Sequence, residues 1–494
     1  MSSVTDDRRR WAMLGVVLLA FMMTVLDATV VNVALPKIQG DLGFSQANLT
    51  WVVNGYLITF GSFLLVAGRL GDLIGRRRVF LVGVAAFAVA SAACGLAESP
   101  GVLVGARIAQ GIGGALAAAA VLAIIVAEFP DPVDRARAMG VYMLVAVSGG
   151  SIGLLVGGVV TDILSWHWIF FINLPIAAAS LVLGRSLITG DRGQGIGTGL
   201  DWAGAITVTL ALMVGVYAIV GAADHGWGSF QTLGLLALTI VMLVGFYMYE
   251  SRIDNPIMPV HILKLRSLMD ASLVRAFVSM GMYASFFFGT LFVQNILGYG
   301  PVRTGLAFLP MTLTVSVLSL GLVARMVRAL GPIRVLMLGL VAMIAGLVVL
   351  GTQGAGVSYF PLLLIAYLLM GFGAGSSFLP LLTLAMAEVP RAEAGLASGI
   401  VNVSMQVSAA IGLAALGTIA ANHTNGLTAG GTALKSAQLS GYHLSIIIAA
   451  AVVGVGVVIA AVMLRPGVKR AAAKAAAAGQ AAAVVPEEQQ AAVH

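Results

Sequence analysis

This sequence of 494 residues has few charged side chains and contains a single cysteine. Only 10% of its residues are Asp, Glu, Lys or Arg, whereas a soluble domain has about 25%. The shortage of charge excludes a protein that is mainly soluble. Because Cys94 is alone, no intramolecular disulfide can form, and no Cys/His cluster has the spacing of metal ligands. We therefore expect no metal and no cofactor. Since the sequence has no catalytic constellation, we also expect no enzymatic activity.

Long apolar runs recur from one end of the chain to the other. A helix needs about 20 such residues to cross a bilayer, and each of these runs is long enough. The sequence therefore predicts an all-α integral membrane protein with fourteen transmembrane helices. The predicted spans are 11–36, 50–70, 78–97, 101–128, 138–162, 168–190, 202–222, 230–249, 268–297, 303–325, 333–351, 358–387, 395–420 and 442–464.

The Lys and Arg residues are distributed unevenly between the predicted loops. If the N-terminus is cytoplasmic, 22 of the 27 lie in cytoplasmic loops, helix ends or tails, and only Lys37, Arg303 and Lys435 lie outside. The remaining two, Arg107 and Arg275, lie within predicted spans. Positive charge stays on the cytoplasmic side during insertion, so we expect a cell inner membrane protein with both termini cytoplasmic. The net charge of +7 then reflects contact with the lipid bilayer rather than with nucleic acid. The outer loops are short, except for a predicted Gly/Thr/Ser-rich loop over 421–441.

A faint internal repeat divides the chain. The segments 321–325 and 331–334 look like a degraded copy of the loop 68–78. Two six-helix halves with a pocket between them at the bilayer midplane form a transporter architecture. The predicted parts are an N-terminal six-helix bundle (1–190), an inserted central helix pair (191–250), a C-terminal six-helix bundle (251–465) and a disordered cytoplasmic tail (466–494).

The loop 68–78 combines glycines, one acid and a block of arginines. Glycine lets two helix ends approach closely, and the arginines hold the turn in the cytoplasm. A basic loop that only sets the topology is the simpler alternative, but the ordered glycines and the acid go beyond what topology requires. The predicted cytoplasmic gate consists of Gly68, Gly71, Asp72, Gly75, Arg76 and Arg77.

Asp27 is the only carboxylate far inside a predicted span. An ionised side chain there costs about 2.5–3.5 kcal/mol on insertion scales, so Asp27 must pair, face water or take up a proton. Arg107 in the fourth span should lie at a similar depth, and Gln110 follows one turn deeper on the same helix face. These three residues are predicted to couple proton movement to transport. A purely structural salt bridge is the alternative.

The fifth span contains a regular series of glycines. Gly149, Gly153 and Gly157 recur every four residues and therefore line one helix face, and Gly158 extends this small surface. Ordinary helix packing is the alternative to a functional role. The stretch 149–153 also matches the hydrolase pattern G-x-S-x-G. A serine inside an apolar helix lacks the strand-to-helix turn and the histidine base that a hydrolase needs, so we reject that interpretation.

Several polar and aromatic side chains within the spans are candidates for contact with a substrate. Asn402 and Gln406 are four residues apart and share a helix face, which indicates either interhelical hydrogen bonds or a polar patch in a cavity. The phenylalanines of the ninth span, Phe286 among them, are expected mostly to pack. The candidate substrate-binding residues are Asn32, Tyr56, Phe286, Gln294, Asn402 and Gln406.

Motifs along nearly the whole chain resemble those of one family. Residues 26–36 closely match the first-helix motif of the fourteen-helix drug:proton antiporters of the major facilitator superfamily. The loop 68–78 and the segment 107–114 are similar to the next two motifs of that subfamily. Further resemblance lies in the segments 166–175, 294–310 and 395–406.

Three positions depart from the pattern of this family. Leu73 stands where a basic residue is usual, and His167 stands where an arginine is usual. Leu154 occupies the place of a proline that usually follows a glycine in the fifth-helix antiporter motif. The glycine framework of that motif is kept, whereas its proline kink is not expected.

The resemblance implies alternating access through a central cavity. Spans 1, 2, 4 and 5 of one half and spans 9, 10, 12 and 13 of the other would line it. Asp72 and its arginines would latch the cytoplasmic side, because the start of span 13 presents a positive helix-dipole end to an acid.

The leading interpretation is multidrug efflux, in which a monomer exports small lipophilic, cationic or neutral amphiphilic compounds in exchange for protons. Such activity would confer antibiotic resistance. Export of lipids or of an endogenous metabolite on the same fold is the first alternative. A membrane receptor or scaffold that does not transport is the second, and it predicts that Asp27 is dispensable.

Overall fold

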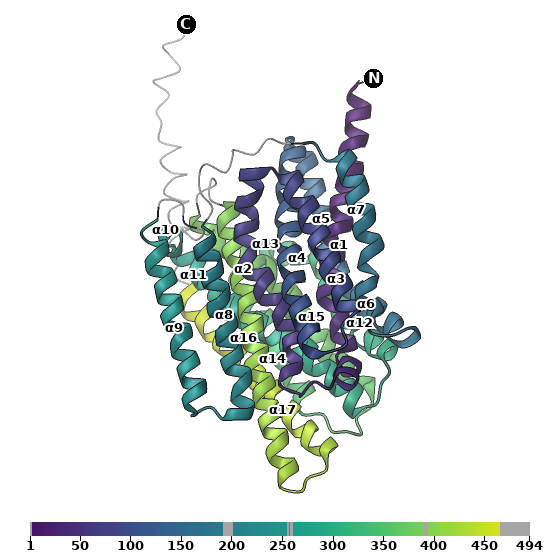
Figure 1. The fold of residues 1–494 in the computed structure, drawn as a ribbon, viewed down its shortest axis with the longest axis vertical. Helices are drawn as coiled ribbons and strands as arrows, with labels where there is room; N and C mark the ends of the chain where they lie inside the picture. The colour runs from purple at the N-terminus through teal and green to yellow at the C-terminus, as the bar shows by residue number, and fades with distance from the viewer. Residues whose placement is uncertain (1, 191–200, 254–255, 257–259, 390–393, 465–494) are drawn as a thin grey trace.

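A computed structural model describes residues 2–190, 201–253, 256, 260–389 and 394–464. These residues form helices joined by short connections, and no strand occurs among them. The long helices run side by side along one direction of the molecule (Figure 1). The predicted all-α class is therefore confirmed.

The helices of the described residues vary widely in length. The α-helices are α1 (Ser2–Leu42), α2 (Trp51–Ile74), α3 (Arg76–Gly95), α4 (Pro100–Glu128), α5 (Pro132–Ile163), α6 (Trp168–Phe171), α7 (Asn173–Leu187), α8 (Trp202–His225), α9 (Phe230–Glu250), α10 (Val260–Leu263), α11 (Arg266–Leu291), α12 (Pro301–Val317), α13 (Val323–Leu330), α14 (Pro332–Gly351), α15 (Leu364–Ala385), α16 (Ala394–Ala429) and α17 (Leu434–Ile459). Short 3-10 turns lie at Asn48–Thr50 and Met386–Glu388, and π-helical turns lie at Phe292–Ile296, Leu318–Leu322, Tyr359–Leu363 and Ala460–Leu464.

Each predicted span falls on a helix of the structure. Within the described residues, twelve helices are long and apolar enough to cross a membrane. The other two predicted spans, 50–70 and 138–162, coincide with α2 and α5, which are continuous helices of 24 and 32 residues. The protein is thus a multi-pass membrane protein, and the number of fourteen crossings stays a prediction.

The predicted outer loop over 421–441 was wrong. Helix α16 continues to Ala429 and α17 already begins at Leu434, and α17 extends beyond the other helices at the lower end of Figure 1. The ring of His423 lies 2.9 Å from the hydroxyl of Ser440, so the two helix ends are held together. Small and polar residues suit such close helix packing as well as they suit a loop.

The inserted helix pair attaches mainly to α16. The hydroxyl of Thr418 donates to the carbonyl of Ile219 at 2.9 Å, and the amide of Asn422 donates to the carbonyl of Ala222 at 3.5 Å. Helix α9 packs on α8 and leaves most of its side chains exposed. The division into two six-helix bundles and an inserted pair, with its boundaries at 190 and 251, stays a prediction.

The loop between α2 and α3 and the loop between α13 and α14 have the same backbone shape. Gly75 has φ 97° and ψ 134°, and Gly331 has φ 83° and ψ 156°. Only glycine adopts such a positive φ readily. The faint sequence repeat therefore has a structural counterpart in these two turns.

The basic helix ends of the N-terminal half meet at one end of the bundle. Trp11 near the start of α1 packs edge-on against Phe129 after α4, with ring centroids 5.3 Å apart. Arg77 at the start of α3 donates to the carbonyl of Arg185 near the end of α7. That this end of the bundle faces the cytoplasm stays a prediction.

Candidate functional site

A buried ion pair joins α1 to α4. Nη1 of Arg107 lies 2.5 Å from Oδ2 of Asp27, and the two side chains are 1% and 0% exposed. Gln110 connects to both, because its Oε1 accepts from Arg107 Nη1 at 2.7 Å and its Nε2 donates to Asp27 Oδ1 at 2.8 Å. The structure thus brings together the three residues predicted from their depth in the membrane.

Two further residues complete this network, and the sequence analysis did not single them out. Nδ2 of Asn173 in α7 donates to Asp27 Oδ1 at 3.1 Å and to Ser91 Oγ at 3.0 Å. Ser91 in α3 accepts from Gln110 Nε2 at 3.1 Å and donates to the carbonyl of Phe170 at 2.8 Å. Four helices therefore contribute side chains to a closed polar cluster. The only available signal for Asn173 was its place in the motif 166–175.

Arg107 is also fixed by groups outside the polar cluster. Its Nε donates to the carbonyl of Val52 at 2.9 Å, and its guanidinium carbon lies 4.5 Å from the ring centre of Tyr56. Tyr56 is itself buried. The guanidinium therefore links α4 to α2 as well as to α1.

The cluster has a direct chemical consequence for a proton that reaches Asp27. Arg107, Gln110 and Asn173 all donate to its carboxylate, and both oxygens act as acceptors. Protonation would remove the negative charge that pairs with Arg107 and turn one carboxylate oxygen into an O–H donor, which would weaken the hydrogen bonds that these three groups donate. Proton uptake would therefore rearrange the contacts between α1, α4 and α7.

The glycine face of α5 lies against α1. A Cβ atom at Gly149 would meet the side chain of Val25 at 2.7 Å, and one at Gly157 would meet that of Val30 at 2.6 Å. A Cβ at Gly153 would overlap the hydroxyl of Thr29. The α1 residues that contact these three glycines all lie within four positions of Asp27.

Gly158 faces a different helix from the other three glycines. A Cβ at this position would meet the carbonyl of Pro301 in α12 at 2.6 Å, and one at Gly305 would meet the carbonyl of Leu154 at 2.7 Å. The prediction that Gly158 extends the same surface was therefore wrong, because adjacent helix positions point about 100° apart. Gly158 instead belongs to the contact between the two halves.

The two halves touch closely at their predicted outer ends. Besides the contact of α5 with α12, a Cβ at Gly417 in α16 would meet the methyl group of Thr50 beside α2 at 2.5 Å. Nε2 of Gln294 donates to the carbonyl of Val33 in α1 at 2.8 Å. Backbone and small side chains thus close the predicted outer side of the molecule.

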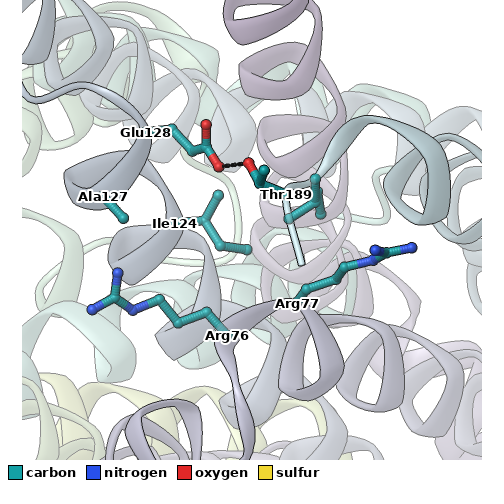
Figure 2. Close-up of a pocket in the computed structure, with 7 residues that line it drawn as sticks. Arg76, Arg77, Ile124, Ala127, Glu128 and Thr189 are labelled. Carbon is teal, nitrogen blue, oxygen red and sulfur yellow. Dashed lines mark hydrogen bonds between the residues drawn. The ribbon is translucent and has the colours of Figure 1, made fainter. Parts of the chain in front are cut away.

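The loop between α2 and α3 contributes to a small cavity at the opposite end. Figure 2 shows Arg76 and Arg77 beside Ile124 and Glu128 of α4, with Thr189 donating to Glu128. The cavity has a volume of about 70 Å³, well below the roughly 300 Å³ of the smallest ligand pockets.

The other members of the predicted gate have distinct surroundings. Gly75 supplies the positive φ of the turn. A Cβ atom at Gly71 would lie 3.8 Å from the side chain of Arg76, and one at Gly68 would meet open space. The side chain of Asp72 lies outside the described residues. Its role as a latch stays a prediction.

The predicted substrate-binding residues do not gather at one place. Asn32 donates to the carbonyls of its own helix, and Tyr56 lies under Arg107. Phe286 stacks on Phe308, with centroids 5.6 Å apart. Gln406 accepts from the hydroxyl of Tyr283 at 3.2 Å. Asn402, which is half-buried, lies one turn before Gln406 on α16, and Gln294 joins the two halves.

No metal site is evident in the part of the chain that the structure describes. No group of three or more His, Cys, Asp or Glu side chains there is placed to hold an ion.

Known proteins resemble this chain over most of its length. The puromycin resistance protein pur8 of Streptomyces alboniger is 38% identical over 464 residues, which cover 93% of this chain and 92% of that protein. The tetracenomycin C resistance and export protein of Streptomyces glaucescens is 33% identical over 84% of this chain and 76% of its own length. The multidrug resistance protein Stp of Mycobacterium tuberculosis is 35% identical over 82% of this chain and 74% of its own length.

Solved structures share the fold at low sequence identity. A bacterial homologue of the human lysosomal transporter Spinster, in an inward-facing and unoccupied conformation, superposes with a TM-score of 0.64 at 17% identity and covers 93% of this chain and 98% of its own. The sequence profile of the Major Facilitator Superfamily matches residues 17–413 and 272–491. Together with the relatives above, this match shows that the chain belongs to the Major Facilitator Superfamily and that its close relatives are drug and antibiotic efflux transporters.

Proposed function

We propose that this protein exports small amphiphilic compounds across the cell membrane in exchange for protons. The observation that carries the proposal is the sealed cluster of Asp27, Arg107 and Gln110 inside the N-terminal half. An ionised carboxylate inside a membrane helix is energetically costly. Protonation of Asp27 would weaken the hydrogen bonds from its three donors and so change the contacts between helices. The names of the relatives support export of drugs or antibiotics as the class of activity.

The contacts suggest how protonation of Asp27 would affect the contact between the two halves at the predicted outer side. Helix α1 carries Asp27 and packs through Val30 on Gly157 of α5, while the next residue of α5, Gly158, touches α12. A shift of α1 after protonation of Asp27 would therefore be passed to the outer closure through α5. Leu154 leaves α5 a continuous helix at this point, so it can move as one rigid element.

The chemistry of the cluster also limits the cargo. Both oxygens of Asp27 are already occupied, so no free deep acid remains to pair with a dication. Neutral or singly charged lipophilic compounds do not need that acid, and they can pack against the Phe and Met side chains of the spans. We infer a preference for such compounds over compact dications.

Membrane placement and assembly follow the same proposal. The basic helix ends around Arg77 and Arg185 would face the cytoplasm, together with both termini. We propose that the protein acts as a monomer in the inner membrane and that Asp72 helps to close the cytoplasmic side.

A flux experiment tests the proposed function. The purified full-length protein is reconstituted into liposomes, and the uphill movement of puromycin, the compound named for one relative, is followed under an imposed pH gradient. Accumulation that collapses when nigericin removes the gradient is the expected result. Puromycin, ethidium and tetraphenylphosphonium all moving only down their gradients, with and without nigericin, would contradict proton-coupled export.

A further inference from the structure

The C-terminal half contains a second buried arginine, Arg275 in α11. It lies nine residues after the start of the helix, or about 14 Å along its axis, and only 9% of its surface is exposed. Unlike Arg107, it forms no ion pair within the described residues, and the contacts that the structure gives it are to neutral groups.

The neighbours of Arg275 are soft and apolar. Its Nη2 lies 3.3 Å from the sulfur of Met405 in α16, and its guanidinium carbon lies 4.5 Å from the ring centre of Phe378 in α15. The Nε atom is buried and donates to no acceptor among the described residues. A thioether and a ring face are weak partners for a cation whose five N–H groups prefer carboxylate or phosphate.

A second polar atom without a partner lies on the same side of the helix. The hydroxyl of Ser272 is buried and has no hydrogen-bond partner in the described part of the chain. It precedes Arg275 by three residues, so the two side chains share a helix face. The guanidinium and the hydroxyl together can donate to one anionic group.

The sequence offers little that could neutralise Arg275 from within. Between residues 266 and 464 the only acids are Asp270, Glu388 and Glu393. Asp270 lies on α11 five residues before Arg275, so its side chain points to another face of the helix, and no ion pair joins these two described side chains. Glu388 accepts from the backbone N–H of Ser267 at the start of α11, and Glu393 lies outside the described residues. A buried charge without a partner strongly disfavours the folded state, so its presence calls for an external anion.

We propose that Arg275 and Ser272 bind the anionic group, a carboxylate or a phosphate, of an amphiphilic cargo molecule. Met405 and Phe378, both half-buried, contact the apolar part of that molecule. The inference rests on the proposed function and deepens it, because α11, α15 and α16 correspond to three of the spans expected to line the central cavity. The inferred site adds singly charged anions to the compounds that the protein would export. The positive charge of Arg275 would also repel a dication.

A binding experiment tests this inference without a proton gradient. The probes are 1-pyrenebutyrate and its neutral methyl ester, measured on the full-length protein in phosphatidylcholine liposomes after subtraction of protein-free liposomes. We expect Arg275→Gln to weaken binding of the carboxylate about tenfold or more, as the loss of a charge-assisted hydrogen bond implies. Binding of the ester should stay unchanged, which also shows that the variant is folded.

Three further variants sharpen the result. Arg275→Lys should keep part of the preference for the carboxylate, and Ser272→Ala should reduce it less than Arg275→Gln does. Arg303→Gln removes an exposed arginine that stacks on Tyr299 and should bind like the wild type. Equal affinity of the wild type and Arg275→Gln for pyrenebutyrate would overturn the proposal.

The source of the anion is tested by changing the lipid. The wild type is compared in liposomes with and without 20 mol% phosphatidylglycerol. Unchanged binding of pyrenebutyrate supports a cargo site, whereas loss of binding in the wild type would assign the same position to a lipid headgroup and overturn the assignment to cargo. If the wild type exports puromycin but does not bind pyrenebutyrate, only the inference about Arg275 fails. Tight pyrenebutyrate binding without any gradient-driven export would instead contradict the proposed function.

Discussion

The strongest prediction on stability concerns the pair Asp27 and Arg107. Asp27→Asn leaves the guanidinium buried without its carboxylate, and Arg107→Gln leaves the carboxylate with only Gln110 and Asn173 as donors. Breaking one partner of a buried pair costs about 3–5 kcal/mol. Each single variant should therefore lower the free energy of unfolding by that amount.

The double variant separates the pair from its surroundings. Asp27→Asn combined with Arg107→Gln removes both charges and leaves two neutral side chains that can bond to each other. It still loses the bond from Arg107 Nε to the carbonyl of Val52, which is worth about 1 kcal/mol. We expect the double variant to be no less stable than either single variant, which gives a coupling free energy of about 3 kcal/mol or more, at or above the upper end of measured couplings.

The chain supplies a matched control for this cycle. Nζ of Lys37 lies 4.0 Å from Oδ1 of Asp162, and the two side chains are 42% and 48% exposed. The coupling free energy of such exposed pairs is about 1 kcal/mol or less. Both cycles can be measured by titrating the protein with sodium dodecyl sulfate in mixed micelles and following its unfolding. A coupling at Asp27 and Arg107 no larger than that at Lys37 and Asp162 would refute the claim that the buried pair is an energetic unit.

Three further predictions follow from the packing and the charges. Gly157→Ala should destabilise the protein by about 1–3 kcal/mol, because its Cβ would meet Val30 at 2.6 Å, whereas Gly140→Ala on the same helix faces open space and should be neutral or stabilising in the same micelle titration. Gln294→Ala removes the hydrogen bond to the carbonyl of Val33 and should shift the balance of states toward an open outer side by about 1 kcal/mol, seen as faster labelling of an outer-face cysteine in a background without Cys94; unchanged labelling would remove Gln294 from the closure. A lipophilic monocation should be exported faster than a dication of similar size in the same vesicles, and equal rates would show that another group supplies the missing negative charge.

The ion pair could be predicted from the sequence because depth in a membrane is encoded in distance along the chain. Asp27 lies about two turns of helix before the predicted end of its span, and Arg107 lies about two turns after the start of its own. That argument places two charges at similar depth, and the cost of burying each charge alone favours their pairing. The argument from depth did not identify Asn173 and Ser91. Neutral polar residues are common in membrane helices, and their contacts depend on how α3, α4 and α7 pack.

Helix faces and helix ends were harder to predict than helix positions. Gly158 belongs to the same glycine run as Gly157 but contacts α12 rather than α1, and only the packed structure distinguishes the two. The segment 421–441 has the composition of a loop, yet α16 and α17 continue through most of it because their ends pack on each other. In both cases a neighbour distant in sequence decides the outcome.

The central claim is that protonation of Asp27 drives export, and one comparison tests it most directly. Wild type and Asp27→Asn are reconstituted in parallel, with Asp162→Asn as a control at an exposed acid. Two rates are measured for each: uphill export of puromycin under a pH gradient, and exchange of labelled for unlabelled puromycin without a gradient. The account predicts that Asp27→Asn loses uphill export but keeps exchange, while Asp162→Asn retains both. Uphill export by Asp27→Asn at the rate of the wild type would contradict the account.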